Sequence, residues 1–169
     1  DTNWKTQADT AVTWGAKESR SEVQLLTNRI LIRVEKANGA VQFLSRDGKK
    51  LLTENPSEPR LLLDSQTWNF FAWDKNERLK SKGVLADDFM DLSTKARYIS
   101  FGQKKLRMPL VLSNKGYAIG VAAGSTVLFC NVRIYGQYIY TQGTGQIDYY
   151  FIYDENQERN IEQYRNLPV

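Results

Sequence analysis

A chain of 169 residues with a formal net charge of +4 has room for one domain around one core, and it contains no histidine. Because histidine is the commonest acid/base group at neutral pH and the commonest zinc ligand, Ser-His-Asp, Cys-His and His-zinc chemistries are excluded. Apolar residues form 41% of the chain, but its longest apolar stretch, at 116–132, is too short for a membrane helix, so we expect a folded protein that spans no membrane.

From residue 22 onward, short β-rich runs alternate with turn residues, a pattern typical of an antiparallel sandwich or barrel. The first predicted strands are 23–27, 30–34, 41–44 and 51–52. Asn38-Gly39 and Asp47-Gly48 predict hairpin turns, because glycine and its partner readily supply positive φ angles. The prolines of loop 54–59 lack a ladder donor and should interrupt pairing. In residues 1–20 we expect at most an edge strand, at 12–14.

Further strands are predicted in the second half of the chain, at 67–73, 83–90, 97–101, 108–112, 117–121, 126–135 and 148–153. The last of them is apolar on both faces, since Tyr150 and Ile152 alternate with Tyr149, Phe151 and Tyr153. Such a strand needs cover on both sides. The pattern predicts either a sandwich core plus a packed helix, or a neighbouring domain.

One helix is predicted at 155–166, with Asp154 as its cap. Its apolar stripe is thin and consists mainly of Ile161, Tyr164 and Leu167. The helix should therefore lie against the sandwich with its other side in solvent. Together these elements predict a single all-β domain over residues 1–169, an antiparallel β-sandwich with one C-terminal helix.

Basic residues gather in three places, at Arg46/Lys49/Lys50, Arg78/Lys80/Lys82 and Lys104/Lys105/Arg107. They would have to share one face to bind a nucleic acid, and acidic residues are interleaved with them. We interpret the clusters as solvated strand faces and turns, with polyanion binding as the alternative. No nucleic-acid partner is expected. The single cysteine, Cys130, has apolar neighbours, which predict a buried thiol.

Glycoside hydrolysis usually requires two carboxyl groups that face each other across the substrate. The best local candidates are Asp87, Asp88 and Asp91. Adjacent Asp87 and Asp88 would point to opposite faces of a strand, while Asp91 precedes Leu92-Ser93 and suits a turn. We therefore predict no convergent pair and no catalytic residue.

Aromatic side chains could stack on sugar rings, because each offers a flat apolar face with a polar edge. The candidates for carbohydrate contact are Trp68, Trp73, Tyr138 and Tyr140. The alternative, that they form the sandwich core or an interdomain surface, agrees better with the dominance of aromatic residues in cores.

Three segments, in order, resemble the N-terminal sandwich of glycoside hydrolase family 31 (GH31), the α-glucosidase and α-xylosidase family. Residues 100–103 resemble its "GxGE" segment, 108–117 its "PFxxSxxGYG" strand pair, and 148–152 with 161–165 its "DYYFIxG…xxxYxxLTG" exit. Gln103 replaces the usual glutamate, Ala118 stands where the second glycine of "GYG" is usual, and the connection to Pro109 is short. These departures put a contribution to the active-site rim in doubt.

The resemblance implies a galactose-mutarotase-like supersandwich that packs on a (β/α)8 barrel carrying the catalytic aspartates. The sequence stops before that barrel, so we expect a non-catalytic accessory domain that braces a barrel on the same polypeptide or a partner chain and shapes carbohydrate access. The alternative is a free-standing module that binds α-linked glycans. Neither needs a cofactor or a metal, and mutarotase-type chemistry would require a histidine.

The sequence alone does not fix the compartment. Bacterial members of the resembled family are often exported, so we expect a periplasmic or extracellular location, with the cytoplasm as the alternative.

Overall fold

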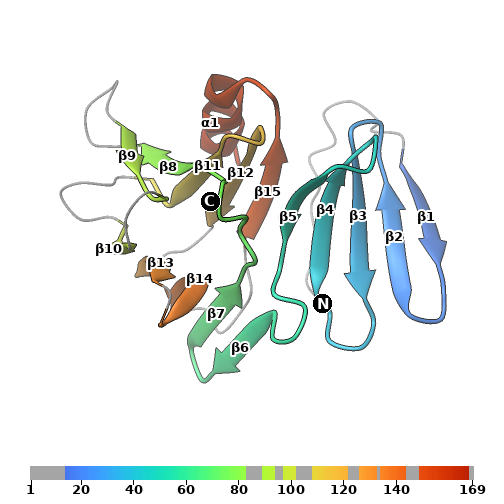
Figure 1. Ribbon diagram of the computed structural model, residues 1–169, viewed down its shortest axis with the longest axis horizontal. Helices are drawn as coiled ribbons and strands as arrows, with labels where there is room; N and C mark the ends of the chain where they lie inside the picture. Colours follow the sequence, from blue (N-terminus) through green and yellow to red (C-terminus); the bar gives the residue numbers. More distant parts are fainter. Residues whose placement is uncertain are drawn as a thin grey trace.

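The computed structural model describes residues 14–82, 89–93, 97–101, 108–121, 126–132, 134–143 and 149–167. Within these ranges the chain forms fifteen β-strands and one α-helix, and the strands make three antiparallel sheets of five strands each (Figure 1). The predicted fold class, all-β and antiparallel with one C-terminal helix, is confirmed. The predicted edge strand at 12–14 lies outside the described residues except for Trp14.

The first sheet is a meander in which each strand pairs with the next along the chain. Its strands are β1 (Gly15–Glu18), β2 (Glu22–Leu26), β3 (Ile30–Glu35), β4 (Val41–Ser45) and β5 (Lys50–Thr53). The two predicted hairpins are confirmed, with φ of 72° at Gly39 and 87° at Gly48. Glycine adopts this left-handed conformation without strain, so local turn chemistry sets the strand order.

The chain crosses repeatedly between the second sheet and the third. The second has the order β10-β13-β14-β7-β6, and its strands are β6 (Arg60–Leu63), β7 (Gln66–Phe70), β10 (Arg97–Ser100), β13 (Val127–Val132) and β14 (Gly136–Gln142). The third has the order β15-β12-β11-β8-β9, and its strands are β8 (Leu79–Lys82), β9 (Phe89–Asp91), β11 (Leu110–Ser113), β12 (Tyr117–Val121) and β15 (Tyr149–Tyr153). These repeated crossings tie the two sheets into one folding unit.

The strand predicted at 126–135 was too long. The region 126–135 is not one strand, because a turn after β13 leads into Gly136, whose φ is 96°. Of the strand predicted at 83–90, Phe89 and Met90 lie in β9, and 83–88 lie outside the described residues. Strand β8, which ends at Lys82, was not predicted.

Strand β6 was also missed, because its Leu61-Leu62-Leu63 run shows no alternation and follows a proline. Pro59 has no N–H to donate, but its carbonyl accepts a hydrogen bond from the Phe70 N–H at 2.9 Å. The proline therefore starts the β6–β7 pairing instead of preventing it.

A single core cluster draws side chains from all three sheets. The first sheet contributes Phe43 and Leu52, the second Phe129 and Ile139, and the third residues such as Tyr117. Phe43 of the first sheet stacks on Phe151 of the third, with ring centroids 3.9 Å apart. Because burial of such side chains is the main favourable term in folding, the sheets stabilise one another.

The opposite face of the third sheet is covered by helix α1 (Gln157–Arg165), which lies beside β11, β12 and β15 (Figure 1). A second core cluster fills this contact and includes Leu110, Leu112, Ile152 and Ile161. On β15, Tyr149, Phe151 and Tyr153 pack on the first cluster, while Tyr150 and Ile152 pack on the second. The sandwich core plus a packed helix, one of the two predicted forms of cover, is therefore confirmed.

The start of α1 corrects the predicted cap. Asn156 is the N-cap, and its Oδ1 accepts a hydrogen bond from the Glu158 N–H at 3.0 Å. Asp154 lies two residues earlier and accepts from the Asn156 N–H at 2.9 Å. Asn156, and not Asp154, accepts a hydrogen bond from an amide in the first turn of the helix.

The apolar stripe predicted for the helix is confirmed, because Ile161 and Tyr164 are buried and Leu167 packs against them. Tyr164 crosses Gly120 so closely that a Cβ at this glycine would lie 2.3 Å from its ring. The Tyr164 hydroxyl donates to the Val121 carbonyl at 3.0 Å. The helix is therefore seated on the one position of β12 that carries no side chain.

Two further expectations concern single features. Cys130 is fully buried, as predicted. No helix within the described ranges is long and apolar enough to cross a membrane.

Candidate functional site

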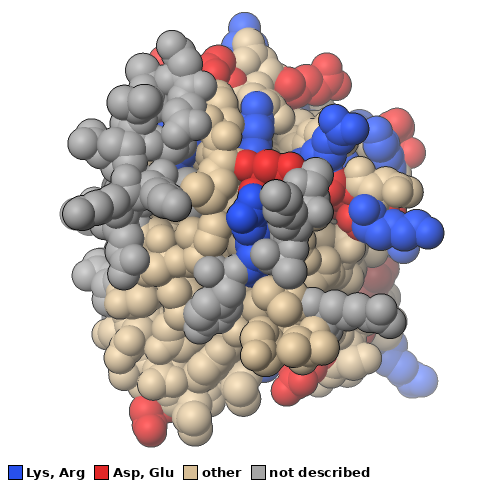
Figure 2. All heavy atoms as spheres, turned by 60° about the vertical axis from the view of Figure 1, so that its left-hand side comes forward, with Lys and Arg blue, Asp and Glu red and all other residues tan. Residues whose placement is uncertain are grey.

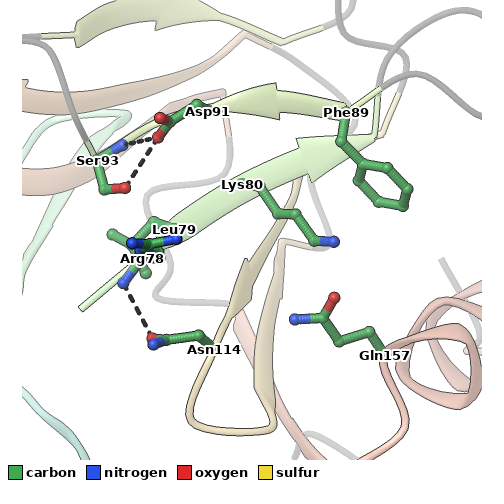
Figure 3. A pocket seen from close by; sticks show the side chains of 8 residues that line it. All are labelled: Arg78, Leu79, Lys80, Phe89, Asp91, Ser93, Asn114 and Gln157. Carbon is green, nitrogen blue, oxygen red and sulfur yellow. Dashed lines mark hydrogen bonds between the residues drawn. The ribbon is translucent and has the colours of Figure 1, made fainter.

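The catalytic carboxylates considered from the sequence do not form a site in the described part of the chain. Asp87 and Asp88 lie outside the described residues. Asp91 is the last residue of β9, and its Oδ1 accepts hydrogen bonds from the Ser93 N–H and Oγ, both at 2.8 Å (Figure 3). This is the turn role that the sequence predicted for it.

Two buried glutamates, Glu54 and Glu77, were not selected from the sequence as candidates for a functional site. Glu54 follows β5 and is completely buried. Its carboxylate accepts from the Val41 N–H at 2.8 Å, from Arg60 at 2.5 Å and from the Tyr149 hydroxyl at 2.7 Å. Burial raises the pKa of Glu54 above its ordinary value, while these donors act in the opposite direction. Because the three donors come from three different sheets, Glu54 joins the sheets.

Glu77 forms a similar junction. Its carboxylate accepts from the Ser113 hydroxyl at 2.6 Å, from the Lys115 ammonium at 2.8 Å and from the Tyr117 hydroxyl. Burial, and then the Glu77 charge, hold the pKa of Tyr117 well above its ordinary value. Lys115 also donates to the Leu51 carbonyl of the first sheet at 3.4 Å. Both buried carboxylates are thus engaged in holding sheets together.

Three of the four aromatic candidates lie together on the outer face of the second sheet. Residues paired across antiparallel strands point to the same side, so the registers define rows. One row crosses four strands as Leu128, Tyr140, Trp68 and Leu61. The neighbouring row contains Cys130, Tyr138 and Phe70. We call these two rows the aromatic face.

Ring contacts within the aromatic face are close. Trp68 and Tyr140 have centroids 4.9 Å apart at an interplanar angle of 54°, and Phe70 and Tyr138 lie 5.6 Å apart, edge to face. All four side chains are half-buried. The structure therefore brings three of the four predicted aromatic candidates together, and Phe70, which the sequence analysis did not select, completes the group.

Trp73, the fourth candidate, lies elsewhere. It is 6% exposed and packs in the central core against Phe71 and Phe129. Its ring has no face available to a ligand at the surface, which corrects its selection as a contact residue. Alternation along the predicted strand 67–73 places Trp68 and Trp73 on opposite faces, but it does not show which of the two faces the core.

Exposed apolar side chains also gather on the second sheet. Of seven large apolar residues that are exposed in the described ranges, five lie on β6 or in the turn between β13 and β14: Leu61, Leu62, Leu63, Ile134 and Tyr135. In Figure 2 the lower part of the molecule shows few charged side chains among the described residues, in contrast to the upper right. Such a concentration is typical of a surface that contacts another protein or a ligand.

Comparison with known proteins gives matches to solved structures. A GH31 dextranase from Flavobacterium johnsoniae matches with a TM-score of 0.73 and 19% identity, over 90% of this chain and 20% of the dextranase. This chain has the β-sandwich fold of a segment of GH31 enzymes. The cycloalternan-forming enzyme of Listeria monocytogenes matches with a TM-score of 0.74 and 16% identity, over 95% of this chain and 18% of that enzyme.

A GH31 α-xylosidase from a soil metagenome matches with a TM-score of 0.66 and 18% identity, over 94% of this chain and 28% of the xylosidase. The sequence matches no protein-family model and no curated protein. The chain spans about a fifth of the dextranase. Because its described part has one helix and only antiparallel sheets, the matched segment is not a (β/α)8 barrel.

Within the described ranges, no group of three or more acidic or cysteine side chains is placed to hold a metal ion. The candidate functional site is therefore the aromatic face with its exposed apolar border. Its chemistry suits contact and packing.

Proposed function

We propose that this chain is a non-catalytic supporting domain of a GH31-type α-glycosidase, and that the aromatic face docks on the catalytic barrel. The barrel would be carried on the same polypeptide or on a partner chain. The observation that carries the proposal is the fold, which corresponds to about a fifth of a GH31 dextranase and of related enzymes. In such enzymes most of the polypeptide lies outside the matched segment.

The chemistry of the aromatic face supports docking to a protein surface. Half-buried rings and exposed leucines on β6 form an apolar area, and burial of such area stabilises an interface. We therefore expect the domain to brace the barrel and to help shape the access of carbohydrate to it.

A free-standing carbohydrate-binding module is the second candidate, and one observation favours it. Trp68, Tyr138 and Tyr140 lie on one sheet face and combine ring area with hydroxyl and indole hydrogen-bond groups. However, the Trp68 ring is tilted by 54° against Tyr140, so the rings do not form one flat platform. The tilt favours the supporting role.

Two measurements on the purified chain test the proposal. We expect no hydrolysis of p-nitrophenyl α-glucoside or α-xyloside above the buffer blank. Titration calorimetry with α-glucans and xylo-oligosaccharides should give no heat of binding. Millimolar or tighter binding that Trp68→Ala abolishes would establish the carbohydrate-binding module instead. Leu26→Ala, at the exposed end of β2 in the first sheet, is the control variant.

A further inference from the structure

Strand β6 forms one border of the second sheet. It pairs with β7 on one side, and no strand among the described residues pairs with it on the other (Figure 1). The side chains of Leu61, Leu62 and Leu63 are 41%, 50% and 57% exposed. The strand therefore presents its outer edge and a run of apolar side chains to solvent.

The pairing with β7 determines which backbone groups of β6 face outward. The Phe70 N–H donates to the Pro59 carbonyl at 2.9 Å, and hydrogen-bonded pairs alternate with non-bonded pairs along antiparallel strands. The N–H and C=O groups of Leu61 and Leu63 therefore face β7, and those of Leu62 face outward. Within the described part of the chain, no group forms a hydrogen bond with the Leu62 backbone.

The outer edge of β6 lacks the protection that edge strands usually carry. Natural edge strands are commonly blunted by charged side chains, because a charge discourages pairing with another chain. Strand β1, at the border of the first sheet, follows this rule with Lys17 and Glu18. In β6 the charged residue, Arg60, is bound to Glu54. The uncharged residues 61–63 do not oppose pairing with a further strand.

The sequence around Leu62 is complementary to itself in the antiparallel direction. When Leu62 of one copy is set opposite Leu62 of a second copy, Leu61 lies opposite Leu63, and Arg60 lies opposite Asp64. Leucines then meet leucines, and the residues opposite each other at both ends have opposite charges. A register shifted by two residues would instead place Leu62 opposite Arg60 or Asp64. A two-fold interface requires this kind of match, because the same surface meets its own copy.

The same register brings leucines together on both faces of the joined sheet. Leu61 and Leu63 share the outer face with Trp68, and Leu62 points to the inner face. Non-bonded pairs approach most closely in an antiparallel ladder, so each Leu61 would contact the Leu63 of the other copy. Burial of these side chains favours association, but one strand from each copy makes a small interface, which is typical of a weak complex.

We propose that two copies of this chain associate through β6, by antiparallel pairing about a two-fold axis at Leu62 that joins their second sheets into one continuous sheet. Each copy uses its single β6 edge, so the assembly closes as a dimer. The inference goes beyond the supporting role and requires no barrel. Failure of the dimer would leave barrel docking untouched, and failure of docking would leave the dimer untouched.

Sedimentation velocity of the whole chain at increasing concentration tests the association. We expect a reversible shift from monomer to dimer as the concentration rises into the high micromolar range. Leu62→Lys, which places two ammonium groups opposite each other at the axis, should weaken the association about tenfold. Ala16→Lys, a matched change on β1, should leave it unchanged. A chain that stays monomeric, or equal weakening by the two variants, would overturn the proposal.

Cysteine cross-linking tests the register. In a hydrogen-bonded antiparallel pair the Cα atoms lie about 5.5 Å apart, which a disulfide can span. Oxidation of Leu62→Cys should therefore give a covalent dimer, while Leu63→Cys, whose two copies are offset along the ladder, should give much less. The native Cys130 is buried and does not compete. Because both leucines are exposed, the variants should keep the wild-type unfolding curve. Cross-linking of Leu63→Cys as fast as that of Leu62→Cys would contradict the proposed pairing.

Discussion

Single buried carboxylates hold the sheets of this protein together. Glu54 and Glu77 each accept hydrogen bonds from donors that the sequence places far away, and the Tyr149 donor lies 95 residues from Glu54. Removing one partner of such a buried pair leaves the other charge buried and uncompensated, which is strongly destabilising. Losing the charge at such a point should therefore affect the whole fold.

Glu54→Gln should destabilise the fold by roughly 3 kcal/mol, because it leaves Arg60, a mostly buried cation, without its partner. Urea unfolding followed by tryptophan fluorescence measures the loss. Glu18→Gln makes the same chemical change in an exposed ion pair with Lys36 and should have little effect. Equal stability losses in the two variants would show that the Glu54 junction does not support the fold.

The charge of Asp154 should make the stability of the fold depend on pH. The hydrogen bond from the Asn156 N–H, and then the charges of Arg29 and Arg159, hold the pKa of Asp154 below its ordinary value of 3.8. The folded state therefore binds this proton less readily than the unfolded state. The carboxylate stabilises the fold above its ordinary pKa, and this contribution is lost as the pH falls through the lowered pKa.

Asp154→Asn should accordingly be less stable than the wild type at pH 7, and the difference should shrink as the pH falls below about 4. Unfolding in urea at pH 7, 5 and 3 measures it. Asp64→Asn is the control, since Asp64 is exposed in a turn with φ of 52°, which asparagine also tolerates. A difference that stays constant with pH would contradict the role of the Asp154 charge.

These residue roles could not be predicted from the sequence. Glu54 and Glu77 carry no local signal, because their importance comes from donors on other strands. Alternation separates Trp68 from Trp73 onto opposite faces of one predicted strand, but only the assembled sheets show that Trp73 lies in the core and Trp68 on the outer face. The single-residue environment depends on how strands are arranged in space, which alternation alone does not determine.

At the scale of elements, the seating of α1 on β12 is the contact that covers the third sheet. One edge of the Tyr164 ring lies against Gly120, and the Tyr164 hydroxyl donates a hydrogen bond to the adjacent Val121 carbonyl. A methyl group at residue 120 would overlap the Tyr164 ring, and the hydroxyl hydrogen bond and the packing of Tyr164 restrict how far that ring can move. The helix would have to shift away from the sheet.

Gly120→Ala should lower the free energy of unfolding by roughly 1–3 kcal/mol, as overpacking of a filled core does. Chemical denaturation measures the change. Gly15→Ala is the matched control, because nothing lies within 4 Å of the added Cβ on β1. If both alanine variants unfold at the same denaturant concentration as the wild type, the contact between Tyr164 and Gly120 has room for a methyl group and the prediction is wrong.

Elements with local signals were predicted well. The glycine turns of the first sheet and the helix after β15 follow from residues that are neighbours in sequence. The misses have local causes too: β6 has three consecutive leucines instead of an alternating pattern, and its pairing starts from the carbonyl of Pro59. The cap of α1 was placed two residues early because Asp154 and Asn156 are both suitable capping residues.

At the scale of the whole molecule, the proposed supporting role rests on the fold and on the position of the aromatic face. Strand β15, apolar on both faces, predicted cover on two sides, and the core and the helix provide it. The aromatic face, by contrast, emerges only when the second sheet is assembled from strands as distant as β6 and β14. Its half-buried rings and exposed border match a surface that meets a larger partner.

The most direct test is the thermal stability of the catalytic barrel in the presence of this domain. A barrel of GH31 type encoded with this chain, on the same polypeptide or beside it, should unfold at a higher temperature with the domain than without it. Leu61→Lys, on the border of the aromatic face, should abolish most of this gain, while Leu26→Lys, of similar exposure on the first sheet, should leave it intact. An unchanged barrel, or equal gains with both variants, would contradict the account.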